Sequence, residues 1–87
     1  MDDELVLALC AGLQELLGGY SVAFEVSRQG LRVIKIIGGS KRWFILIQDG
    51  GILRLMVKGR VSVVFDLSYP SSIDNLVTTI TGVGVVV

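Results

Sequence analysis

The sequence predicts an α+β domain, in which a four- to five-stranded antiparallel meander is flanked in the chain by two helices that pack on one of its faces. Three observations lead to this prediction. Apolar residues repeat with a helical period before residue 18 and after residue 70, and with a period of two between them. Glycine-containing turns separate the short alternating segments, as in antiparallel hairpins. With 87 residues and 52% hydrophobic composition, residues 1–87 form a single domain around one core.

Residues 3–17 are predicted to form the first helix. Its apolar stripe consists of Leu5, Leu9, Leu13 and Leu16, widened by Val6, Cys10 and Leu17. Acidic residues in the first turn complement the helix dipole, and Gly18-Gly19 ends the helix. Gly12 lies inside the helix, where glycine costs about 1 kcal/mol relative to alanine. We therefore expect Gly12 to permit close packing on the sheet.

The strands are predicted within residues 20–68. The alternating segments are 20–28, 31–37, 42–49, 52–58 and 61–68. Loops at 28–30, 50–51 and 58–60 predict one register. This register gives an inner face of Val22, Phe24, Val26, Ile34, Ile36, Phe44, Leu46, Leu53, Leu55, Val57, Val63, Phe65 and Leu67. The other face then carries Lys35, Ile37, Lys41, Trp43, Ile45, Ile47, Ile52, Arg54, Met56, Lys58, Ser62, Val64, Asp66 and Ser68.

Residues 71–82 are predicted to form the second helix. Ser71 or Ser72 supplies the N-cap, and Gly82 ends the helix. The apolar stripe is Ile73, Leu76, Val77 and Ile80. The apolar tail, residues 83–87, is expected to pair with a sheet edge, to pack on the core or to enter an oligomer interface.

Charge is unevenly distributed along the chain, although the total is zero. Residues 1–27 carry five carboxylates and no cation, and residues 61–87 carry two carboxylates and no cation. The segment between them, residues 28–60, holds all eight cations against Asp49 alone, a net of +7. The cations are Arg28, Arg32, Lys35, Lys41, Arg42, Arg54, Lys58 and Arg60. Such a segment indicates a surface that attracts an anionic partner.

Several kinds of site are excluded or disfavoured. The chain has no histidine and only one cysteine, Cys10, so it has no histidine-dependent catalytic set, no thiolate metal site and no internal disulfide. We interpret Cys10 as a small apolar residue of the first helix. The segment GGSK lacks the spacing and the following helix of a phosphate-binding P-loop. Glu25 and Asp66 are interpreted as solvated strand charges rather than an acid–base pair. We therefore expect no enzymatic activity, cofactor, metal or small-molecule substrate.

The N-terminal region favours a cytoplasmic protein that does not enter a membrane. Its longest apolar stretch, LVLALCAGL, is far shorter than the roughly 20 residues of a membrane span. The acidic start MDDE is unlike the positively charged start of a secretory signal.

The predicted outer face mixes cations with large apolar side chains, and two interpretations of it remain open. In the first, the apolar residues form an interface with another subunit, and the cations reach its rim. In the second, the cations follow a phosphate backbone while Trp43 and its aliphatic neighbours stack bases, at roughly 1–3 kcal/mol per base. Both uses can coexist in one oligomer.

The order of helix, antiparallel meander with a basic and apolar open face, and helix occurs here in a histidine-free chain rich in Val, Ile and Gly. In this it resembles the small ThermoDBP-related single-stranded-DNA-binding proteins of thermophilic archaea. The resemblance spans most of the chain and rests on architecture and composition. It implies a cleft for bases beside the sheet, and oligomers that lengthen the path of the strand.

From the charge pattern and this resemblance we expect sequence-independent binding of single-stranded DNA or RNA by a homo-oligomer, through the basic, partly apolar open face. The alternative is an oligomerising protein-interaction or structural module that buries the same face against a partner. The predicted nucleic-acid-binding residues are Lys35, Lys41, Arg42, Trp43, Arg54, Met56, Lys58 and Arg60.

Overall fold

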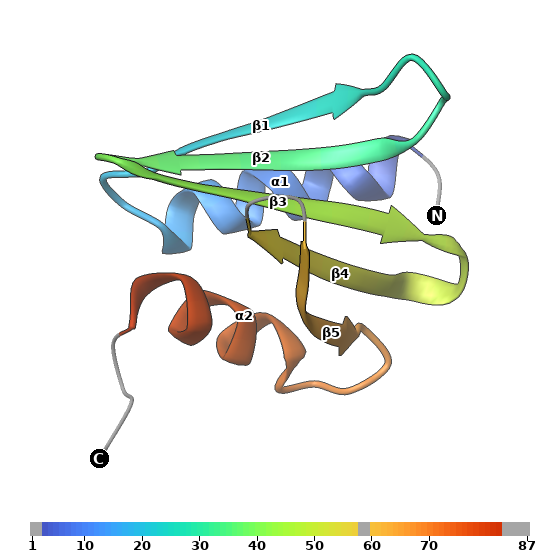
Figure 1. Ribbon diagram of the computed structural model, residues 1–87. Coiled ribbons are helices and arrows are strands. Elements are labelled where there is room, and N and C mark those ends of the chain that lie inside the picture. The colour runs from blue at the N-terminus through green and yellow to red at the C-terminus, as the bar shows by residue number, and fades with distance from the viewer. Residues whose placement is uncertain (1–2, 58–59, 83–87) are drawn as a thin grey trace.

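The computed structural model of the chain describes residues 3–57 and 60–82, with the side chains of residues 60–62 left out. Its elements are α1 (Asp3–Leu16), β1 (Ser21–Val26), β2 (Arg32–Gly38), β3 (Lys41–Gln48), a short 3₁₀ turn η1 (Asp49–Gly51), β4 (Ile52–Val57), β5 (Arg60–Asp66) and α2 (Ser72–Thr81) (Figure 1). All neighbouring strands pair antiparallel, in the order β1-β2-β3-β4-β5. The predicted α+β class and the open antiparallel meander are therefore confirmed.

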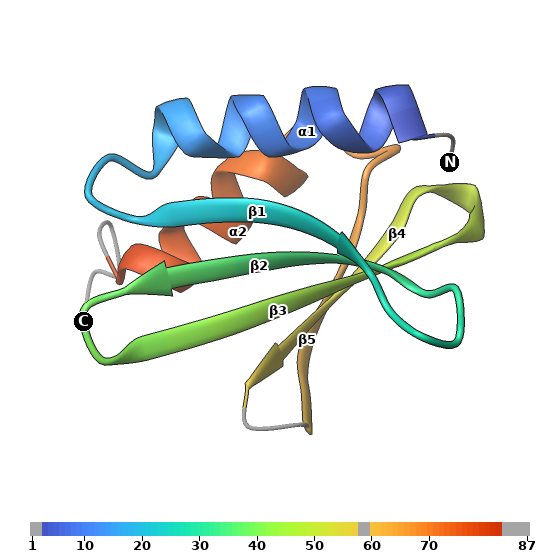
Figure 2. The ribbon, with the colours of Figure 1, turned by 90° about the horizontal axis from the view of Figure 1, so that it is seen from above.

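Both helices lie on the same side of the sheet, as Figure 2 shows. α1 contacts β1 and α2 contacts β5, so the two helices cover opposite ends of one face. The strands twist strongly, and β4 and β5 run across the direction of β1, β2 and β3 in Figure 2. The core between helices and sheet consists of Val6, Leu13, Leu17, Ile34, Ile36, Ile45, Ile47, Leu53, Leu55, Phe65, Leu76 and Ile80. Among the described residues, no helix covers the other face of the sheet.

The buried stripe of α1 is narrower than predicted. Val6, Leu13 and Leu17 are buried, and Leu9 and Cys10 pack partly against the core. Leu5 and Leu16, which were expected in the stripe, are 58% and 53% exposed. Both lie about a quarter of a turn from the centre of the stripe, where a helix packed on a sheet meets solvent. The expectation for Gly12 is also wrong, because a Cβ atom there would meet nothing within 4 Å.

The hairpin between β1 and β2 has the predicted register. The Ser27 N–H donates to the carbonyl oxygen of Leu31 at 2.8 Å, and Gly30 has a left-handed φ of 80°. Val22 therefore lies opposite Ile36, on the side that faces the helices. A glycine at this loop position avoids the strain that a Cβ atom would cause at positive φ.

β3 presents the opposite faces from those predicted. The loop before it has two residues, Gly39-Ser40, so Gly38 pairs with Lys41. Phe44 and Leu46, which were expected in the core, point away from the helices. The residues that face the helices are Trp43, Ile45 and Ile47, which were expected to point outward.

The length of the loops explains this reversal. The loop after β3 has three residues, Asp49–Gly51, instead of the predicted two at 50–51. One residue more or less in a loop turns every side chain of the next strand to the other face. Because β3 is apolar on both of its faces, its own pattern does not select one. Relative to the prediction, the longer loop after β3 reverses the faces a second time, so Leu53 and Leu55 are buried as predicted.

β4 and β5 pair as predicted along most of their length. Leu53 lies opposite Phe65 and Leu55 opposite Val63, and the register then shifts by one residue. This irregularity increases the local twist and turns the end of β4 away from β3. Part of the predicted loop at 58–60 lies outside the described residues.

α2 has the predicted stripe and the predicted end. Leu76 and Ile80 are buried, with Ile73 and Val77 packed beside them. The N–H of Gly82, at a φ of 72°, donates to the carbonyl oxygen of Thr78 at 2.8 Å and closes the helix. Ser71 is the N-cap residue, but its side chain makes no cap hydrogen bond. Instead, the hydroxyl of Ser72 donates to the backbone oxygen of Asp66. The apolar tail at 83–87 lies outside the described residues.

Candidate nucleic-acid interface

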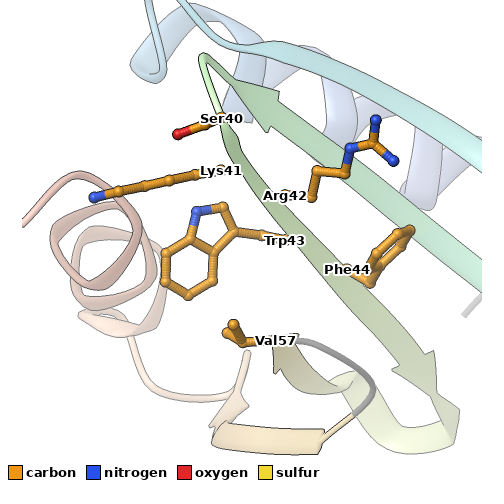
Figure 3. A pocket seen from close by; sticks show the side chains of 6 residues that line it. All are labelled: Ser40, Lys41, Arg42, Trp43, Phe44 and Val57. Carbon is orange, nitrogen blue, oxygen red and sulfur yellow. The ribbon is translucent and has the colours of Figure 1, made fainter.

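The side of the sheet that faces away from the helices is called the outer face below. It carries Val33, Lys35, Ile37, Arg42, Phe44, Leu46, Ile52, Arg54 and Met56. Four predicted site residues therefore share it: Lys35, Arg42, Arg54 and Met56. Lys41 and Trp43 do not, since they lie on the side of β3 that faces α2, as Figure 3 shows. Lys58 and the side chain of Arg60 lie outside the described residues.

Phe44 occupies a central position on the outer face. Its cross-strand neighbours are Lys35 on β2 and Met56 on β4. In the adjacent row, Leu46 lies beside Arg54. Side chains that are directly opposite on one face have Cβ atoms about 5 Å apart. The half-buried ring of Phe44 thus has the ammonium group of Lys35 on one side and the guanidinium group of Arg54 diagonally across from it.

An apolar depression of about 320 Å³ lies on this face and is called the outer groove below. It is lined by Leu31, Val33, Phe44, Leu46 and Met56. Leu31, from the β1–β2 loop, is 47% exposed at its rim. A continuous apolar surface of this kind is typical of a binding site.

The cations around the groove are held in different ways. Arg54 donates from Nε to Oε1 of Gln48 at 2.6 Å, which fixes its guanidinium group on the outer face. Arg42 is exposed and Lys35 half-buried. Arg32 is on the helix side, where its Nε lies 2.5 Å from Oδ1 of Asp3.

The carboxylates of the sheet lie on its two edge strands. Glu25 is on β1 and is exposed. Asp66 ends β5, and its Oδ1 accepts a hydrogen bond from the Ser68 N–H at 2.9 Å. This bond and one from the Ser68 hydroxyl hold the pKa of Asp66 below its ordinary value. Four strand spacings, roughly 19 Å, separate β1 from β5, so these carboxylates form no acid–base pair. The middle of the outer face is consequently cationic, with negative charge at its margins.

A second cavity, of about 550 Å³, opens where β3 and β4 separate, and it is called the fork below. It is lined by Ser40, Lys41, Arg42, Trp43, Phe44 and Val57 (Figure 3). Pairing between β3 and β4 begins only at Phe44 and Met56. The preceding residues of β3 pair with β2 and, within the described part of the chain, with no residue of β4. Within the described residues, this short length of the β3 edge has no strand partner at the fork.

Trp43 is half-buried and packs against the core from the helix side of β3. Its Nε1 atom is buried and has no hydrogen-bond partner among the described residues. The prediction that Trp43 points out from the open face is therefore wrong. The aromatic residue that does so is its neighbour Phe44.

Phe44, Leu46, Leu31 and Val33 are the residues of the outer groove that the sequence prediction missed. The Gly39-Ser40 pair could have indicated the orientation of Phe44 and Leu46, because Gly-Ser is a common two-residue hairpin loop. Such a loop gives the register that the structure has. For Leu31 we find no local signal, since its exposure depends on the curvature of the whole sheet.

Other kinds of chemistry have little support. No group of three or more His, Cys, Asp or Glu side chains that could hold a metal ion occurs among the described residues. Partial burial on α1 raises the pKa of the Cys10 thiol and so disfavours the reactive thiolate.

In the part of the chain that the structure describes, no helix is long and apolar enough to cross a membrane. No protein family, curated protein or solved structure matches the chain.

Proposed function

We propose that this protein binds single-stranded DNA or RNA through its outer face, without sequence preference and without catalysis. One observation carries the proposal: the face that no helix covers combines Lys35, Arg42 and Arg54 with the ring of Phe44 and an apolar groove. Cations neutralise phosphates, and an aromatic ring stacks any base because every base has a π-face.

The geometry favours a single strand over a duplex. Bases in a duplex are stacked on one another, whereas those of a single strand can lie flat against a sheet. The residues of the outer groove are all apolar, so they accept a base by its face and do not read the hydrogen-bonding edge that differs between bases. Binding of this kind discriminates little between sequences.

The resemblance to the ThermoDBP-related proteins supports the same function. It also supports a homo-oligomer, in which outer faces of several copies extend the path of the strand. Lys41 remains a candidate for a phosphate contact beyond the outer face. Lys58 and Arg60, whose side chains lie outside the described residues, remain predicted phosphate contacts.

A titration of a labelled single-stranded oligonucleotide, followed by fluorescence anisotropy at several salt concentrations, tests the proposal. Each phosphate neutralised on a single strand contributes about −0.7 to the slope of log K against log salt concentration. Contacts from Lys35, Arg42 and Arg54 thus predict a slope of about −2 or steeper. Absence of binding at low salt would contradict the proposal.

Phe44→Ala removes the stacking surface while leaving every cation in place. We expect affinity for the oligonucleotide to fall by about 5- to 150-fold, which corresponds to roughly 1–3 kcal/mol for one stacked base. The matched control is Tyr69→Ala, since Tyr69 is an aromatic residue 65% exposed outside the outer face. Equal affinities of the two variants would refute the role of Phe44.

A second candidate function has its own support in the outer groove. Five apolar side chains line it, and association between copies of the chain would bury them. In that case the outer face serves as a structural or protein-interaction surface. The two functions predict opposite effects of one substitution, which is described in the Discussion.

A further inference from the structure

The fork adjoins the outer groove and is continuous with it through Phe44, which lines both cavities. Its volume, about 550 Å³, is within the range of about 300–1,000 Å³ that is usual for small-molecule sites. A strand that crosses the outer face over Phe44 therefore arrives at the opening of the fork.

The lining of the fork combines three features that suit a nucleotide. Lys41 and Arg42 reach out on opposite sides of β3 (Figure 3), and no carboxylate is among the described residues that line the fork. The rings of Trp43 and Phe44, with Val57 across from them, supply apolar and aromatic surface for a base. The edge of β3 that has no strand partner among the described residues adds backbone donors and acceptors that can bond the edge of a base.

We propose that the fork receives one nucleotide of the strand bound on the outer face, with its base inside and its two flanking phosphates at Lys41 and Arg42, one on each side of β3. This inference rests on the proposed function and specifies the route that the bound strand follows. The strand follows the outer groove, passes Phe44 and crosses the edge of the sheet where β3 and β4 separate. Trp43, although on the helix side, then belongs to the binding surface.

Trp43 is the only tryptophan of the chain, so its emission reports on the fork alone. The full chain is titrated with a short labelled oligothymidylate, and label anisotropy and Trp43 emission are recorded together. We expect Trp43 emission to fall in step with the rise in anisotropy. A rise in anisotropy with unchanged Trp43 emission would overturn the fork and leave the outer face intact. No rise at low salt would overturn both proposals.

Val57→Phe tests the fork by filling it while leaving all cations and both lining rings in place. We expect oligonucleotide affinity to fall by about 5- to 100-fold, as for the loss of one stacked base, and the quenching of Trp43 to disappear. Val26→Phe adds the same ring at a position 58% exposed on β1 and should bind as the wild type does. Wild-type affinity and quenching in Val57→Phe would refute the inference.

Lys41→Gln provides a test that does not disturb packing, because Lys41 is exposed. We expect a loss of a few-fold in affinity and a slope of log K against log salt that is shallower by about 0.7. Arg28→Gln, in the exposed β1–β2 turn, is the matched control and should keep the wild-type slope. An unchanged slope in Lys41→Gln would contradict the phosphate contact at the fork.

Discussion

Gly38 lies against the ring of Tyr20, and this contact shows how one residue determines the packing at the end of the sheet. A Cβ atom at Gly38 would overlap the ring carbons Cδ2 and Cε2 of Tyr20. Tyr20 in turn packs against the core. The glycine is therefore needed for close approach of a side chain, and no positive φ is involved at this position.

Gly38→Ala should lower the free energy of unfolding by about 1–3 kcal/mol, because the Tyr20 ring must leave its packed position. Gly12→Ala, where nothing lies within 4 Å, should instead raise it by about 1 kcal/mol through helix propensity. Urea denaturation of both variants measures these changes. In a Tyr20→Ala background the cost of Gly38→Ala should shrink, and an undiminished cost there would disprove the contact as its cause.

Trp43 and Phe44 show how adjacent residues acquire different roles. Trp43 packs toward the helices, whereas Phe44 lies between Lys35 and Met56 on the outer face. Both are aromatic and both follow cations in the chain, so their local sequence does not distinguish them. Because the two residues lie on opposite faces of β3, Trp43 contacts the core and Phe44 presents its ring on the outer face.

At the scale of elements, α1 protects the edge strand β1. The Nε2 of Gln14 donates to the carbonyl oxygen of Tyr20 at 2.7 Å, and its Oε1 accepts the Val22 N–H at 3.1 Å. One side-chain amide thus takes the place that a neighbouring strand would occupy. Unpaired strand edges favour association with other chains, and this contact reduces that tendency.

Gln14→Ala should lower the free energy of unfolding by about 1 kcal/mol, since both hydrogen bonds are exposed and partly replaced by water. It should also speed hydrogen exchange of the Val22 amide. Glu15→Ala, at the exposed position next to it, should change stability by less than about 0.5 kcal/mol. Equal exchange rates for the Val22 amide in the two variants would show that Gln14 does not protect the edge.

At the scale of the whole molecule, folding brings cations from three strands together on one face, whereas in the sequence they are only spread along the middle segment of the chain. Cations from β2, β3 and β4 surround the middle of the outer face, and the carboxylates of the sheet lie on the edge strands β1 and β5. The net charge is zero, yet an approaching polyanion meets a positive centre. This arrangement favours nucleic-acid binding over association of two identical faces, whose like charges would repel each other.

Leu46→Lys separates the two candidate functions. It places a cation in the outer groove, where it would disrupt an apolar interface between copies but attract a phosphate. If the outer face binds single strands, oligonucleotide affinity should be kept or raised, and the salt slope should steepen by about 0.7. Sedimentation velocity and anisotropy measure the two effects. Loss of oligonucleotide binding together with dissociation of an oligomer would favour the interaction module.

The sequence alone was sufficient to predict the element order, both helices and the stripe of α2. These features depend on local periodicity, glycine positions and caps, and such signals are present in any short window of the chain. It also determined the β1–β2 register, because Gly30 permits only a few loop geometries, and the cationic character of the middle segment.

Only the tertiary structure decided which face of β3 meets the helices. Both of its faces are apolar, so the choice depended on the register that the two flanking loops set. Trp43 was consequently predicted on the open face, where the structure has Phe44, and the sequence did not locate a cavity between β3 and β4. The fork arises because twist and an irregular register separate the end of β4 from β3, and such a separation is set by the packing of all five strands together.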